Sequence, residues 1–260
     1  MSFSAAWLDL REPADLSARD AGLLAAAREY AGEALVLDLG CGTGAMRRAF
    51  GGSGRWRMLD RDPALLAVAA ERAGAGVAVV AGDLREIGRL PLDDVRLVTA
   101  SALLDLASAE WVEALAGRLA AAGAGFYATL SYDGAMGWEP ALGGDAAARA
   151  AFNAHQRRDK GFGPALGPDA AAFSAAALGR CGYRVRTAAS PWRLGPGELQ
   201  AALIGGIAEA AAEAGMAGAD EWGQARRAAS GSGCTVGHVD LLALPAGASA
   251  QSKTTSESRP

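Results

Sequence analysis

The residues best suited to chemistry in this sequence surround a turn that has glycine at every second position. Asp38 stands in the apolar run 34–39, and Gly40, Gly42 and Gly44 follow it. Because glycine has no side chain, the backbone can bend sharply there and approach a ligand closely. A helix that starts directly after such a turn points free N–H groups into the same space. The pattern therefore predicts a ligand-binding site at this turn.

The spacing of the acidic residues indicates which ligand the turn accepts. A dinucleotide-binding turn usually reads GxGxxG, whereas this turn reads GxGxG, with Asp38 two residues before the first glycine. A carboxylate there would oppose a pyrophosphate and favour a cationic group. Asp60 lies 22 residues beyond Asp38, where a carboxylate can accept both hydroxyls of a ribose. Asp83 follows the next apolar run and offers an acceptor to an adenine amine. The three acids favour a nucleoside that carries an amine and a sulfonium.

These acids stand at the ends of successive strands in a predicted parallel sheet. Apolar runs alternate with helical patterns, which is typical of a doubly wound α/β sheet covered by helices on both faces. Ligands of such sheets bind at the carboxyl ends of the strands. The expected strands span residues 34–39, 56–60, 77–81, 95–100, 125–130, 183–188 and 235–244, and the expected helices span residues 45–50, 63–74, 109–122, 145–156, 169–179 and 197–215.

The pattern divides the chain into three regions. Residues 1–33 are expected to form an N-terminal helical segment, because a capping-box spacing precedes an apolar run there. The main domain is expected over residues 34–245. Within it, residues 132–168 form a long insertion after the fifth strand that is rich in Gly, Pro, Trp and charge, and such stretches are often functional. Residues 246–260 have no apolar period and are expected to be a disordered tail.

Over roughly residues 34–130, the combination of glycine turn and strand-end acids resembles the class I S-adenosylmethionine-dependent methyltransferases. The resemblance implies a Rossmann-like, mostly parallel, seven-stranded sheet whose last strand is antiparallel. It also implies S-adenosylmethionine as the cofactor and an insertion that caps the substrate. The cofactor-binding residues expected from it are Asp38, Gly40, Cys41, Gly42, Gly44, Asp60, Arg61, Asp83, Leu84 and Ser101. We further expect Arg19 or Arg11 to pair with the cofactor carboxylate, since an arginine fork binds carboxylates with two hydrogen bonds.

The methyl acceptor is expected between the fourth strand and the insertion. His155 is the only histidine near this place, and its ordinary pKa near 6.5 would let it take a proton from a hydroxyl or amine, so it is the candidate catalytic residue. Lys160 or Arg157 could hold an anionic group. The full set of expected acceptor-binding residues is Asp105, Tyr132, Trp138, His155 and Lys160. The alternative is that the charges of the insertion are simply solvated.

Composition excludes several function classes. The chain has 260 residues, a net charge of -4 and no basic stripe, so a nucleic-acid partner is not expected. Three separated cysteines and two histidines form no metal-ligand spacing, so no metal site is expected. The sequence has no signal-peptide pattern and no apolar run of 18 residues, so a cytoplasmic protein without a membrane partner is expected.

The sequence thus predicts a methyltransferase that acts on an oxygen or nitrogen nucleophile of a small molecule by in-line transfer. Two alternatives remain at this point: an NAD-dependent oxidoreductase, and a non-catalytic protein that binds S-adenosylmethionine. The identity of the acceptor, the atom that is methylated and the use of a general base are left open by the sequence. The oligomeric state is open as well, and a homodimer is compatible with the composition.

Overall fold

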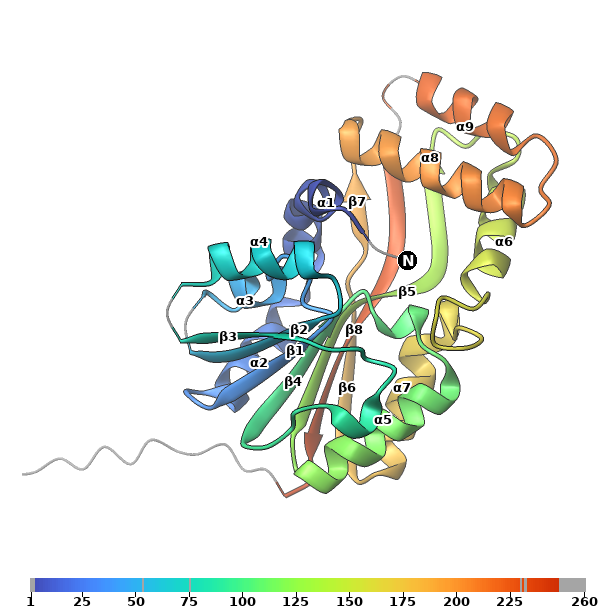
Figure 1. The fold of residues 1–260 in the computed structure, drawn as a ribbon. Coiled ribbons are helices and arrows are strands. Elements are labelled where there is room, and N and C mark those ends of the chain that lie inside the picture. The colour runs from blue at the N-terminus through green and yellow to red at the C-terminus, as the bar shows by residue number, and fades with distance from the viewer. Residues whose placement is uncertain (1–2, 53, 75, 230, 232, 248–260) are drawn as a thin grey trace, which may run out of the picture.

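The computed structural model describes residues 3–52, 54–74, 76–229, 231 and 233–247, and its centre is one twisted sheet (Figure 1). The strand order is β3-β2-β1-β4-β5-β8-β6, and β7 pairs with β8. The strands are β1 (Leu35–Leu39), β2 (Arg55–Asp60), β3 (Val77–Ala81), β4 (Val95–Ser101), β5 (Gly125–Glu139), β6 (Tyr183–Ala189), β7 (Trp192–Leu194) and β8 (Gly233–Pro245). The α-helices are α1 (Ala5–Ala18), α2 (Ala21–Ala31), α3 (Ala45–Ala49), α4 (Pro63–Ala73), α5 (Ala109–Ala122), α6 (Asp145–Gln156), α7 (Ala170–Arg180), α8 (Glu198–Glu213) and α9 (Ala219–Ala228).

Strands β1 to β5 are mutually parallel, and the final strand β8 runs antiparallel to both β5 and β6. This confirms the doubly wound, mostly parallel sheet with an antiparallel last strand. The short β7 adds an eighth strand to the seven that were expected, because Trp192 to Leu194 pair with the early part of β8.

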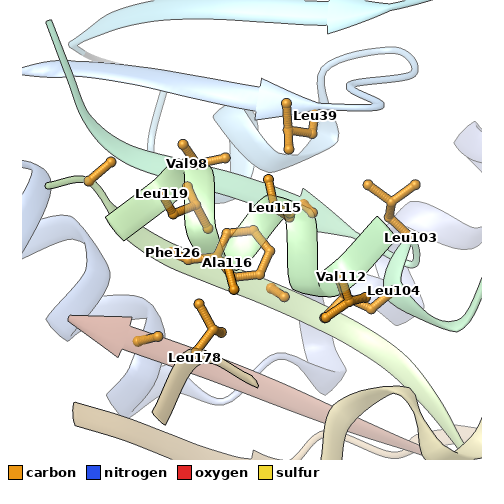
Figure 2. Close-up of a cluster of buried hydrophobic side chains, with 14 of the residues drawn as sticks. Leu39, Val98, Leu103, Leu104, Val112, Leu115, Ala116, Leu119, Phe126 and Leu178 are labelled. Carbon is orange, nitrogen blue, oxygen red and sulfur yellow. The ribbon is translucent and has the colours of Figure 1, made fainter. Parts of the chain in front are cut away.

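The sheet is covered on both faces because its central strands place buried apolar side chains on each face. Successive side chains of a strand point to opposite faces, so Leu37 and Leu39 enter the layer beneath α5 and α7, whereas Val36 enters the layer beneath α2, α3 and α4. Figure 2 shows the first of these layers, in which Leu115 and Leu119 of α5 lie over the sheet. Each fully buried leucine of this kind stabilises the fold by about 1.5–3 kcal/mol.

The two N-terminal helices begin where polar side chains cap them. Ser4 accepts a hydrogen bond from the Trp7 N–H at the start of α1, and Asp20 accepts one from the Leu23 N–H at the start of α2. Helix α2 packs on the sheet, while α1 lies over the carboxyl ends of the strands and contacts β7. The N-terminal segment is therefore helical, as predicted, and it forms two helices that lie on different parts of the sheet.

The largest difference from the expected elements lies after residue 130. Strand β5 continues to Glu139, and its distal part, residues 131–139, pairs with residues 233–239 of β8. We call the lobe built by these two strand segments with α6, β7, α8 and α9 the cap lobe (Figure 1). Its hydrophobic cluster joins residues far apart in the chain: Leu130, Tyr132, Met136, Trp138, Ala148, Trp192, Ile204, Ile207, Ala208, Trp222, Cys234 and Val236.

The sequence predicted only some elements of the cap lobe, among them α6 and α8. The stretch 131–139 contains glycine, aspartate and glutamate, and its strand partner lies about a hundred positions later, so local composition suggested a loop. Helix α9 has few apolar residues and was not expected either. The tail prediction for residues 246–260 falls almost wholly outside the described residues. Within the described part of the chain, every helix is too short or too polar to traverse a bilayer.

Candidate active site

The glycine turn is fixed by the carboxylate at the end of the second strand. Gly40, Gly42 and Gly44 all have positive φ, a conformation that glycine adopts without strain. Asp60 accepts a hydrogen bond from the Gly42 N–H at 2.9 Å through one oxygen, and from the Asp62 N–H at 3.0 Å through the other. The Asp60 carboxylate is therefore held in one orientation beside the turn. Asp60 and Gly42 both line the cleft.

Asp38 is a buried carboxyl with one oxygen left to bind something else. The residue is 2 % exposed, and its Oδ1 accepts a hydrogen bond from Thr99 Oγ1 at 2.8 Å. Its Oδ2 is buried without a hydrogen-bond partner among the described residues. Burial is the main cause that raises the pKa of Asp38 to about 7, while the Thr99 hydrogen bond and the charge of Arg19 act in the opposite direction. A buried orphan oxygen of this kind is costly unless a ligand satisfies it.

Arg19 is a buried cation near Asp38. The residue is 6 % exposed and donates one hydrogen bond to Ser101 Oγ at 3.1 Å, while its Nε and Nη1 are buried without a partner among the described residues. Its side chain does not line the cleft directly and approaches it through Ser101, which does. Arg11 lines the cleft itself, although Asp15 already holds its guanidinium at 3.0 Å and the indole of Trp192 lies beneath it.

The cleft lies at the carboxyl ends of the strands and consists of two adjoining hollows. Both are lined by Leu8, Arg11, Gly40, Gly42, Ser101 and Ala102. The larger hollow, with about 910 Å³ of empty space including its open mouth, adds Asp60, Arg61, Asp83 and Leu84. The smaller hollow adds Asp15, Asp38, Cys41 and Thr43. Two strand-end carboxylates therefore face one end of the cleft and the third faces the other end.

Asp83 differs from the other two acids because a neighbouring side chain holds it. Arg85 donates to its carboxylate from Nε at 2.8 Å and also from Nη2, and the backbone N–H of Arg85 binds it at 2.9 Å. These hydrogen bonds lower the pKa of Asp83 to about 2. Its neighbour Leu84 is buried, and the Leu84 carbonyl accepts the indole N–H of Trp111 at 2.7 Å. The turn after β3 is thus rigid where it borders the cleft.

At the part of the cleft where the methyl acceptor is expected, the structure brings Lys160 and His155 together. Lys160 and Phe162 line the larger hollow opposite the segment Ser101–Leu106. His155 is 8 % exposed and lies behind Lys160, with its Nδ1 at 3.2 Å from Lys160 Nζ and its Nε2 at 2.9 Å from Glu213 Oε2. The side chain that reaches the cleft is therefore Lys160, and His155 stands behind it.

Asp105 is close enough to Lys160 to influence it electrostatically. It lies in the short 3-10 helix after β4, and its Oδ1 is buried without a partner among the described residues. Burial raises the pKa of Asp105 to about 6, whereas the charges of Arg11 and Lys160 oppose that rise. Burial also lowers the pKa of Lys160. This part of the cleft thus brings the half-buried Lys160 near the buried carboxyl of Asp105.

Two residues expected to bind the acceptor lie in the cap lobe cluster instead. Tyr132 is buried, donates its hydroxyl to Asn153 Oδ1 at 2.7 Å and packs edge-on against Phe152. Trp138 is 9 % exposed and packs against the ring of Trp222 at 5.3 Å. Stacking on a planar substrate needs an open ring face, and the ring of Trp138 is covered in this structure, so its contact with the acceptor stays a prediction. The sequence could not reveal this, because the residues that cover these rings lie far along the chain.

Three contributors to this region were not expected from the sequence. Thr99 fixes one oxygen of Asp38, Leu8 covers the glycine turn, and Glu213 binds His155 from α8. Thr99 follows apolar residues in a buried strand, and a hydroxyl at such a position indicates a buried hydrogen bond that the sequence could have suggested. Glu213 carries no such signal, because it ends a long alanine-rich helix 58 positions after His155.

The structure places Asp38 and Asp60, on which the resemblance to the class I S-adenosylmethionine-dependent methyltransferases was based, beside the GxGxG turn of a doubly wound sheet. Residues 36–122 match the model of a family described as "Methyltransferase domain", which spans β1 to the end of α5. The match covers about a third of the chain and shows a methyltransferase domain over those residues. No relative among curated proteins matches the sequence.

Two solved structures share the fold at low sequence identity. The YcgJ protein from Bacillus subtilis is 14% identical, with a TM-score of 0.51, over 87% of this chain and 99% of that one. A protein from Bacillus halodurans C-125 is also 14% identical, with a TM-score of 0.51, over 85% of this chain and 98% of that one. At such identities the likeness concerns the fold alone.

Proposed function

We propose that this methyltransferase acts on a small molecule and transfers the methyl group to an oxygen or nitrogen nucleophile. The proposal is based on the different side chains that line the two parts of the cleft. One part presents the acids suited to the cofactor, and the other presents Lys160 and the ring of Phe162 beside the apolar side chains of Leu103 and Leu106. Such a lining suits a compact acceptor that carries one polar reacting group.

The residues on the cofactor side suit S-adenosylmethionine. The free Oδ2 of Asp38 would accept from its ammonium group, and Asp60 would accept from its ribose hydroxyls. The charge of Arg19, which approaches the cleft through Ser101, would favour the cofactor carboxylate there. A nicotinamide dinucleotide would instead bring a pyrophosphate toward Asp38, and like charges repel. These contacts favour the methyltransferase over the oxidoreductase alternative.

The bound cofactor supplies an electrophilic methyl group on a sulfonium, whose departure as a neutral sulfide needs no acid. The work left to the protein is to hold the nucleophile in line at attacking distance, which contributes roughly 7–11 kcal/mol in well-oriented reactions. The segment Ser101–Leu106 and Phe162 would position the acceptor, and α1 would exclude water by covering the turn through Leu8. A hydroxyl or protonated amine must also lose a proton, for which a nearby base is required.

Two measurements test the proposal. Titration calorimetry of the purified protein with S-adenosylmethionine, S-adenosylhomocysteine and NAD should register binding of the first two and none of NAD. The protein should then be incubated with S-adenosylmethionine and a panel of phenols, carboxylic acids and amines. Mass spectrometry should detect a product that is heavier than its acceptor by one CH₂ unit. Binding without any turnover across the panel would instead favour the non-catalytic alternative.

A further inference from the structure

Lys160 is an unusual residue in this chain. The sequence contains 25 basic residues, and only Lys160 and Lys253 are lysines. All other basic positions are arginine, which cannot give up its proton in a protein, whereas a lysine amine can when it is shielded from water. The one lysine among the described residues therefore stands in the part of the cleft where the methyl acceptor is expected.

A continuous line of hydrogen bonds leads from Lys160 to solvent. Its Nζ lies 3.2 Å from His155 Nδ1, and His155 Nε2 lies 2.9 Å from Glu213 Oε2. Since an ammonium can only donate, Nδ1 must accept, so Nε2 carries the proton that is donated to Glu213. Glu213 has 57% of its side chain exposed and lines a surface groove between α8 and α9. The line thus begins in the cleft, crosses the cap lobe through a buried ring and ends in water.

We infer that Lys160 is the general base for the methyl acceptor and that His155 and Glu213 carry the released proton to solvent. This inference rests on the proposed function, because an acceptor with an O–H or N–H bond is required. As the nucleophile bonds to the methyl carbon, the C–S electron pair returns to sulfur and the O–H or N–H proton moves to the neutral Lys160 amine. The ammonium then passes a proton to His155 Nδ1, and the Nε2 proton of the ring moves to Glu213. Exchange with water restores the starting tautomer.

Three charged groups influence the pKa of Lys160. Glu213 on α8 and Asp105 after β4 favour its ammonium form, whereas Arg158 in the loop after α6 disfavours it. Burial has the largest effect and lowers the pKa of Lys160, so a neutral amine is available nearer to neutral pH than in a free lysine. His155 contributes a neutral acceptor rather than a second cation while Nδ1 accepts from Lys160.

The inference can be tested without a known acceptor, because a second lysine, Lys253, and a second histidine, His238, serve as references in the same sample. Competitive labelling with acetic anhydride, read by mass spectrometry across pH 6 to 11 (about the range in which lysines titrate), follows Lys160 and Lys253 in one sample. Histidine labelled with ¹⁵N follows His155 and His238 in one spectrum, and burial lowers the pKa of His238 to about 3, so its signal should stay constant.

We expect Lys160 to reach half-maximal labelling at a lower pH than Lys253. The Nδ1 resonance of His155 should change at that same pH, and this change should vanish in Lys160→Met. Glu213→Gln should lower the midpoint of Lys160 further by removing a negative charge, whereas Glu209→Gln, at an exposed position one turn away on α8, should leave it in place. Equal midpoints for the two lysines, or a His155 signal that ignores Lys160, would overturn the inference.

The same samples separate this inference from the proposed function. Calorimetry with S-adenosylmethionine should show unchanged binding in Glu213→Gln, because Glu213 lies outside the cofactor side of the cleft. Binding combined with uncoupled lysine and histidine signals would refute the proton path and leave the methyltransferase assignment intact. Absence of binding in the wild-type protein would refute the assignment itself, whatever the labelling shows.

Discussion

Leu8 lies directly above the glycine turn, so that a methyl group added to Gly42 would come within 2.9 Å of its Cδ1 atom. Leu8 belongs to α1 and Gly42 to the turn after β1, and the contact brings the N-terminal helix down onto the cofactor cleft. The absence of a side chain at this position therefore serves two purposes. It permits a φ of 53° in the turn, and it lets α1 close over the cleft.

Gly42→Ala should weaken both stability and cofactor binding. The positive φ costs roughly 1–2 kcal/mol for an alanine, and the added methyl group pushes Leu8 and α1 away. Adding Leu8→Ala should relieve the second effect but not the first, so the double variant should regain part of the affinity for S-adenosylmethionine while its free energy of unfolding stays low. Urea unfolding and calorimetry on the single and double variants measure the two effects. If the losses of affinity in Gly42→Ala and Leu8→Ala simply added in the double variant, the clash between residue 42 and Leu8 would not explain the weaker binding.

Asp38→Asn should stabilise the cofactor-free protein and abolish most of its cofactor binding. The folded-state pKa of Asp38 is raised to about 7, so ionisation in the buried site lowers the stability of the fold as the pH rises from about 4 to about 7, and the cost is complete above that. Asparagine removes this cost, hence the melting temperature should rise at pH 8 and change least at pH 4. The exposed Asp93→Asn is the control. A lower melting temperature for Asp38→Asn at pH 8 would contradict the argument.

Asp60 and Asp83 should differ in importance although both end a strand at the same cleft. Asp60→Ala removes a ribose acceptor and also the hydrogen-bond acceptor of the Gly42 N–H, so affinity for S-adenosylmethionine should fall by about 2–3 kcal/mol, or roughly 30- to 150-fold. Asp83 is already bound by Arg85, and Asp83→Ala should cost only a few-fold (about 1 kcal/mol or less). Calorimetry with each variant ranks them, and the reverse order would refute the assigned roles.

The cofactor half of the molecule was predictable because its signals are local. Asp38, the three glycines and Asp60 fall within 23 consecutive positions, and their spacing alone identified strand ends and the turn. The parallel strands were visible as unbroken apolar runs, since both faces of the sheet are covered. The contacts of Thr99 with Asp38 and of Leu8 with Gly42 join segments far apart in the chain, and these were not predicted.

The acceptor half could not be predicted because its parts meet only in three dimensions. Residues 131–139 form a strand because β8 pairs with them, and His155 is held by a glutamate at position 213. His155 and Lys160 were both assigned to the acceptor side because they lie in the same polar stretch of the insertion, and the structure places them in hydrogen-bond contact. Glu213 of α8 binds His155, whereas Lys160 lines the cleft. The position of α8 could not be predicted from the local sequence around residues 155–160.

Trp138 should matter for the stability of the cap lobe rather than for contact with the acceptor. Its ring packs against Trp222 and lies beneath Arg226, which Asp145 holds. Trp138→Ala should therefore destabilise the fold by about 3–5 kcal/mol, whereas Trp138→Phe should retain most of the packing. In Trp138→Phe the KM for any acceptor found in the panel should stay within a factor of about two, less than a lost stacking contact would cause. A large rise of KM in a stable Trp138→Phe protein would restore the stacking role.

Lys160→Arg distinguishes a proton acceptor from a simple positive charge. Arginine keeps the charge and much of the length but stays protonated, so kcat with an acceptor identified by the panel should fall by roughly 10²- to 10⁴-fold. The affinity for S-adenosylmethionine should not change, since the cofactor acids lie elsewhere in the cleft. In the wild type, kcat should rise with pH until the Lys160 amine is neutral, and this rise should be absent in Lys160→Arg. Lys253→Arg, at the other lysine of the chain, is the matched control. If Lys160→Arg kept its turnover while Lys160→Met lost acceptor affinity, Lys160 would serve as an electrostatic anchor for an anionic group, and the proton would have to leave by another route.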